Sequence, residues 1–177
     1  SSNNLSKSMS LIRKIFVIVC ISFISGISNI SAEEIKKIGK YKDWEAKVLY
    51  EKSGKVCFAQ SSPILQKPKS NKRDANLFVA FRPEENIKNE ISVTSGYEFN
   101  NNTVTAVSGK NKFKFDIKEQ GFAWIEDSKI ELKMINRMKK GSRLMVTGYD
   151  QNNSQTIDDY SLLGFTKAYN VSKKACS

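Results

Sequence analysis

The sequence of 177 residues contains no histidine, and this absence removes the most familiar catalytic designs. Histidine is the base of Ser-His-Asp and Cys-His sites and the commonest side-chain ligand of transition metals. The chain also lacks a Gly-x-Ser-x-Gly turn, a Ser-x-x-Lys pair, a Gly-Lys-Ser/Thr phosphate loop and a Gly-x-Gly-x-x-Gly fingerprint. We therefore expect no catalytic residue, no cofactor and no metal, and an enzyme built from this chain would have to use carboxylates.

The sequence also has no apolar run long enough to cross a bilayer comfortably, although a short one lies near its start. Residues 15–24 (IFVIVCISFI) follow a basic beginning at Met9 that includes Arg13 and Lys14, and small or polar residues then continue to Ala32. This order is typical of a secretory signal peptide, because a full span needs about 20 apolar residues. A retained N-terminal anchor is the alternative.

The predicted cleavage divides the chain into parts. We predict that residues 1–32 are an N-terminal extension and signal peptide cleaved near Ala32, that residues 33–42 are a short lead-in, and that residues 43–177 form a single β-rich domain. The mature form would have no transmembrane span. Since residues 1–32 contain three basic residues and no acid, their removal leaves 26 basic and 18 acidic groups and lowers the net charge from +11 to +8.

Cysteine is scarce, with three in the chain. Cys20 lies in the apolar run, and Val19 precedes it where a lipoprotein signal needs Gly, Ala or Ser, so we interpret Cys20 as an ordinary part of that run. Cys57 and Cys176 remain after cleavage, and an oxidising compartment favours a disulfide between them. They stand too far apart in the sequence for a zinc knuckle or a Cys-x-x-Cys redox site. Two free thiols are the alternative.

Alternation of apolar and polar residues predicts short antiparallel strands along most of the domain. Examples are residues 43–50, the central strand at 77–82 (LFVAFR) and the half-buried strand at 112–118. The period becomes helical at residues 128–140, and residues 166–175 have a helical composition. We predict a mostly β fold of eight or nine strands, an antiparallel β-sandwich or partly closed barrel with one internal amphipathic helix and a C-terminal helix.

The internal helix has recognisable ends. Ser128 can cap its start with Glu131 three residues later, and Gly141 follows its basic end. Met134 and Met138 fall at helical spacing, and we expect them to pack in the core rather than to bind a ligand.

A basic segment at residues 62–75 is long for a simple connection between strands. Its Lys67, Lys69, Lys72 and Arg73 predict a possible anion-binding loop for an anionic envelope component, such as lipopolysaccharide phosphates. No aromatic residue is interleaved among these cations, so we expect no specific nucleic-acid binding. On composition alone we favour a solvated loop that keeps the protein soluble, and anion binding is the alternative.

Asp158 and Asp159 form an adjacent acidic pair near the end of a predicted strand. Two carboxylates can divide the acid and base roles of glycan hydrolysis if their environments separate their pKa values. Neighbours along a strand point to opposite faces, however, and two such groups cannot readily reach one substrate atom. We therefore favour a strand-end role for the pair and keep a carboxylate-based hydrolase as the alternative.

The C-terminal part carries a family resemblance. Residues 159–169 (DYSLLGFTKAY), together with Trp44, the stretch 56–60 (VCFAQ) and Cys176, resemble the invasion-associated locus B family of alphaproteobacteria over about residues 40–176. The resemblance implies a periplasmic or outer-membrane-associated β-sandwich, named for host-cell invasion in one pathogenic branch. Many members have a cysteine on the first strand where this chain has Val48 or Leu49, so the family's full set of disulfides does not carry over.

Together these features favour an exported, non-enzymatic envelope protein that binds an anionic component or a protein partner. A chaperone-like or structural subunit that uses an exposed sheet edge is a further possibility. We assign Tyr160, Leu162, Gly164 and Phe165 to the fold, with Gly164 permitting the turn from strand to helix.

Overall fold

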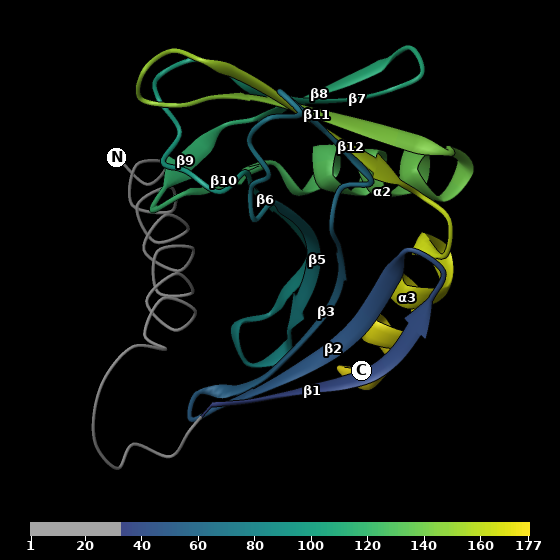
Figure 1. The fold of residues 1–177 in the computed structure, drawn as a ribbon. Coiled ribbons are helices and arrows are strands. Elements are labelled where there is room, and N and C mark those ends of the chain that lie inside the picture. Colours follow the sequence, from purple (N-terminus) through teal and green to yellow (C-terminus); the bar gives the residue numbers. More distant parts are fainter. Residues whose placement is uncertain (1–32) are drawn as a thin grey trace. The chain divides into compact units, whose positions relative to one another are not determined.

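The computed structural model describes residues 33–177, which form two antiparallel sheets and two α-helices (Figure 1). The mostly β, sandwich-like fold predicted from the sequence is confirmed, and the sheets do not close into a barrel. The predicted signal peptide, with Cys20, lies outside the described residues. Neither helix within them is long and apolar enough to cross a membrane.

The larger sheet has seven strands. In spatial order they are β1 (Glu34–Tyr41), β2 (Trp44–Glu51), β3 (Gly54–Ser61), β5 (Asn76–Arg82), β6 (Ile87–Thr94), β10 (Phe122–Trp124) and β9 (Ile117–Glu119). β2 and β3 form a hairpin, and the apolar β5 lies between β3 and β6 as expected of a central strand. A short 3-10 helix at Pro83–Glu85 follows β5, because proline cannot donate to the ladder.

The smaller sheet has five strands. In spatial order they are β4 (Leu65–Lys67), β12 (Gln155–Ser161), β11 (Arg143–Tyr149), β7 (Val104–Ser108) and β8 (Asn111–Phe115). Alternate residues of each longer strand are buried, as in β7, where Val104, Ala106 and Ser108 face inward. One face of this sheet therefore packs on the core, and the other faces solvent.

The helices α2 (Ser128–Lys140) and α3 (Phe165–Ala175) complete the core (Figure 1). Met134 and Met138 are almost fully buried and pack with inward-facing residues of both sheets, which confirms that they are core residues. α3 packs against β1, β2 and β3. A disulfide joins Cys57 on β3 to Cys176 after α3, as the cysteine count predicted.

Two segments differ from the sequence-based expectation. Residues 34–41, assigned to a lead-in, form the edge strand β1, whose mostly exposed side chains show little apolar alternation. Residues 112–118 are not one strand, because the chain breaks at Asp116 into β8 and β9, which belong to different sheets. Alternation continues across that break, and periodicity alone cannot reveal a change of sheet. The described residues accordingly contain twelve strands rather than eight or nine.

The short connection from β12 to α3, residues 162–164, requires glycine at its last position, Gly164. Its φ is +90°, and a Cβ there would lie 1.8 Å from the backbone oxygen of Tyr41. The following Phe165 is fully buried, with its ring edge-on to Trp44 at 4.9 Å between centroids. The Trp44 indole also donates a hydrogen bond to the Ser161 carbonyl at 2.9 Å. The contacts of this segment are those of a structural element, because it fastens the β1–β2 turn and the start of α3 to the core.

The N-cap of α2 is Asp127 rather than Ser128. The Asp127 carboxylate accepts a hydrogen bond from the backbone N–H of Lys129 at 2.8 Å. Asp127→Ala should therefore lower the free energy of unfolding by about 1 kcal/mol, while Ser128→Ala should leave it nearly unchanged. Urea unfolding followed by circular dichroism measures both variants. A larger loss for Ser128→Ala than for Asp127→Ala would contradict the assignment.

Candidate functional site

The basic segment between β3 and β5 is organised by one glutamine. The Gln66 side-chain oxygen accepts from the Arg73 N–H at 3.1 Å, and its side-chain nitrogen donates to the Arg73 carbonyl at 3.1 Å. The Gln66 amide therefore makes the same pair of hydrogen bonds with the Arg73 N–H and C=O that the backbone of a neighbouring strand would make. We call residues 67–72 between these two positions the clasped loop. The two ends of the loop are therefore fastened to each other by the Gln66 side chain.

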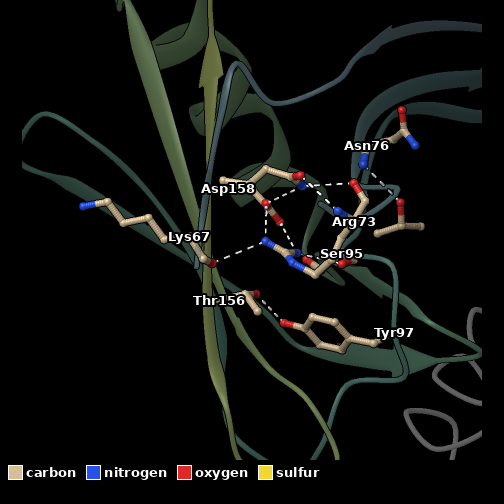
Figure 2. A network of polar contacts seen from close by, with 9 residues as sticks. Lys67, Arg73, Asn76, Ser95, Tyr97, Thr156 and Asp158 are labelled. Atoms are coloured by element: carbon tan, nitrogen blue, oxygen red, sulfur yellow. Dashed lines mark hydrogen bonds and ion pairs between the residues drawn. The ribbon is translucent and has the colours of Figure 1, made fainter. Parts of the chain in front are cut away.

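A buried ion pair anchors the base of the clasped loop (Figure 2). The Arg73 guanidinium donates to both Asp158 carboxylate oxygens, at 2.7 and 3.1 Å, and the side chains are 4% and 0% exposed. Arg73 also donates to the Ser95 carbonyl at 2.7 Å, and Gln66 donates to Asp158 at 3.0 Å. The network ties the loop to β12 and to the end of β6, which are distant in the sequence.

Two tyrosines border this network. The Arg73 guanidinium lies 5.8 Å from the centroid of the Tyr97 ring, and the Tyr97 hydroxyl shares a hydrogen bond with Thr156 (Figure 2). Burial raises the pKa of Tyr97, and burial together with the Asp158 carboxylate raises the pKa of Tyr160 well above its ordinary value. Both phenols therefore stay protonated near neutral pH.

Asp158 and Asp159 point to opposite sides of β12, as strand geometry predicted. Asp159 is held on the outer side by Arg143, whose Nε and Nη2 donate to its two oxygens at 3.1 and 2.7 Å. Each carboxylate thus forms an ion pair with a different arginine. A glycosidase needs two carboxylates that face one cleft, and this pair does not provide that geometry. Among residues 33–177, acids and cysteines also form no group that could hold a metal ion.

The structure separates the four predicted anion-binding residues into two roles. Lys67, Lys69 and Lys72 are exposed on the clasped loop, whereas the Arg73 side chain turns inward to Asp158. Sequence reasoning did not foresee this role for Arg73. One pattern in the sequence could have indicated it: Asp158 alternates with Thr156 and Tyr160 on the buried side of β12. A buried carboxylate requires a cationic partner, so an arginine or lysine had to turn inward to meet it.

A polar hollow of about 280 Å³ opens beside β2 and β3. Its lining residues are Lys40, Lys42, Asp43, Glu45, Lys47, Gln60, Ser61, Ser62 and Ile64. Burial alone would raise the pKa of Glu45, but hydrogen bonds from Lys47 and Lys37 bring it below its ordinary value. Lys47 also donates to Gln60 at 2.9 Å. Asp43 and Glu45 therefore offset part of the lysine charge in the hollow.

Comparison with known proteins provides a family and a related fold. A family model described as invasion associated locus B (IalB) protein matches residues 44–173. Among solved structures, the chain is similar to invasion associated protein B from Bartonella henselae, with a TM-score of 0.55 and 13% sequence identity. That similarity covers 79% of this chain and 97% of the other, and at this identity it shows the fold alone. No match was found among curated proteins.

Proposed function

The chain belongs to the invasion associated locus B family, and from this premise we propose that it is an exported envelope protein that binds an anionic component without catalysis. Its place would be the periplasm or the outer membrane, after cleavage of the signal peptide near Ala32. The observation that supports binding is the clasped loop, which presents Lys67, Lys69 and Lys72 to solvent on an anchored base.

The construction of the loop favours binding for a physical reason. Ordering a flexible loop on association costs free energy, and a loop that is already ordered avoids most of that cost. The Gln66 clasp and the Arg73–Asp158 pair supply this order from beneath, so the lysines remain free to meet a ligand. Lysine is a compact point charge that suits phosphate oxygens, and a basic protein also attracts such partners over distance.

The clasped loop can be tested by removing equal charge from two places. The variant Lys67→Gln/Lys69→Gln/Lys72→Gln should bind phosphatidylcholine vesicles that contain lipopolysaccharide on the order of tenfold more weakly than the unmodified protein, because each lysine near an anionic surface contributes to binding. The control Lys129→Gln/Lys133→Gln/Lys140→Gln removes three exposed charges from α2 and should bind almost normally. Vesicle co-sedimentation measures both variants.

Two outcomes would contradict this proposal. Equal losses in the loop variant and the α2 variant would mean that only net charge matters and that the loop has no special role. Failure of the unmodified protein to prefer lipopolysaccharide-containing vesicles over pure phosphatidylcholine vesicles would remove the anionic ligand altogether.

A further inference from the structure

The five-stranded sheet has a second face that points away from the core. The strand register defines two rows across this outer face, namely Leu65, Asp159, Met145, Val107 and Lys112, and next to it Lys67, Ile157, Thr147, Thr105 and Lys114. Leu65 is 53% exposed and Met145 is 44% exposed, which is high for side chains of this size.

The helices lie on the other side of this sheet (Figure 1). Inward-facing Leu144, Val146 and Phe113 are buried with α2 residues Met134 and Ile135 in one core cluster. Since side chains alternate along a strand, the neighbours of these residues must face outward. The outer face therefore points to solvent rather than into the core, and its apolar residues Leu65, Met145, Val107 and Ile157 form a stripe that Asp159 and two threonines interrupt.

The lysines of these two rows lie at the two edges of the outer face. Lys112 and Lys114 stand on the edge strand β8, and Lys67 stands on the opposite edge strand β4, next to the rest of the clasped loop. Four strand spacings separate β4 from β8, a distance of about 19 Å. Asp159, the one acid in the two rows, is neutralised by Arg143. The middle of the face thus carries apolar Met145, Val107 and Ile157 beside two threonines and the Asp159–Arg143 pair, and lysines stand at both of its edges.

We propose that the outer face of the five-stranded sheet lies on the surface of an anionic lipid bilayer. The lysines of both edges contact headgroup phosphates, while Leu65 and Met145 insert among the headgroups and upper acyl chains. This inference rests on the proposed function and identifies the anionic component as lipid in a membrane. Charge complementarity supports it, because a bilayer offers phosphates to both basic edges at once and apolar atoms to the stripe between them.

A second copy of the chain is a poorer occupant of the same face. Pairing two such faces would bring lysine-bearing edges into the neighbourhood of one another, and like charges at an interface oppose association. A protein with an acidic rim and an apolar centre would also match the charges. It is distinguished from a bilayer by the experiment below.

A tryptophan introduced in place of Met145 reports directly on contact with lipid. The existing Trp44 and Trp124 are 0% and 1% exposed, so they form a constant background. In the full chain, Met145→Trp should show a blue-shifted emission and quenching by brominated acyl chains when vesicles of phosphatidylglycerol and phosphatidylcholine are added. Tyr50→Trp on β2, at a residue 49% exposed in the other sheet, should bind the same vesicles without quenching. All variants carry the same N-terminal segment, so differences between them arise from the substituted side chain.

A second pair of variants separates insertion from charge. Leu65→Ser/Met145→Ser should bind the anionic vesicles roughly tenfold more weakly, because apolar area is lost. Its affinity for soluble inorganic polyphosphate should stay unchanged, because every lysine remains. The replaced side chains are exposed, and circular dichroism should confirm that the fold is retained.

The outcomes distinguish failure of this inference from failure of the proposed function. If the Met145→Trp variant binds vesicles while its introduced indole is not quenched, the loop binds without the face and this inference is overturned. A dimer in sedimentation that Leu65→Ser/Met145→Ser converts to a monomer would show the face to be an interface between copies, and would also overturn it. If no variant binds anionic vesicles or polyphosphate, the proposed function fails as well.

Discussion

Replacing Asp158 by alanine is expected to lower the free energy of unfolding by about 3 to 5 kcal/mol, because it leaves the Arg73 guanidinium buried without its counter-charge. Both side chains are almost fully buried, at 4% and 0% exposure. Arg73 Nε already has no hydrogen-bond partner among residues 33–177, so the remaining cation would lose most of its compensation. Gln66 would also lose the carboxylate that accepts from its amide. Urea unfolding monitored by tryptophan fluorescence measures the loss.

The next residue on the same strand supplies the control. Asp159→Ala breaks the pair with Arg143, whose side chain is 47% exposed, and water replaces what the arginine loses. Its effect on stability should be much smaller than that of Asp158→Ala. The double variant Arg73→Met/Asp158→Leu removes both buried charges and should recover most of the lost stability. Equal effects of Asp158→Ala and Asp159→Ala would refute the view that burial makes the first pair important.

Removing the disulfide should have an effect of similar size. In the chain-entropy model, a bridge that closes a loop with a sequence separation of 119 residues stabilises the native state by about 5 kcal/mol. The bridge ties the residue after α3 to β3, so its loss frees the C-terminal end of the chain in the unfolded state. Cys57→Ala/Cys176→Ala should therefore unfold at a clearly lower urea concentration than the oxidised protein.

Two comparisons test the role of the bridge. The unmodified protein treated with dithiothreitol should match Cys57→Ala/Cys176→Ala, since both lack the bridge. Cys20→Ala should match the oxidised protein, because we predict that Cys20 leaves with the signal peptide. If Cys57→Ala/Cys176→Ala is as stable as the oxidised protein, the bridge contributes nothing to folding.

Local patterns account for the part of the fold that was predictable. The period of two in β2 and β5 and the helical spacing of residues 128–140 depend on neighbours within a few positions, and each was recognised in the sequence. The Cys57–Cys176 bridge was predicted for another reason, since the expected cleavage near Ala32 would leave only these two cysteines to pair. The N-cap at Asp127 was missed by one residue because Ser128 has equally good capping chemistry.

The candidate site was only half visible before the structure. Four cations in one segment suggested an anion-binding loop, and three of them are exposed on it. The role of Arg73 depends on Asp158, which is 85 positions away, and no local pattern pairs two residues at that distance. The outer face was also hidden, because it requires the register of five strands that come from separate parts of the sequence.

The sequence by itself determined the absence of histidine chemistry, the positive charge and the β-rich fold, which follow from composition and from contacts between near neighbours. It also predicted the pairing of Cys57 with Cys176 from the small number of cysteines. Only the tertiary structure decided that Arg73 is an anchor while Lys67 is a surface charge, and that Leu65 and Met145 share one exposed face. The physical reason is that burial and strand register are properties of the packed chain, and residues of like charge take opposite roles according to the side on which they face.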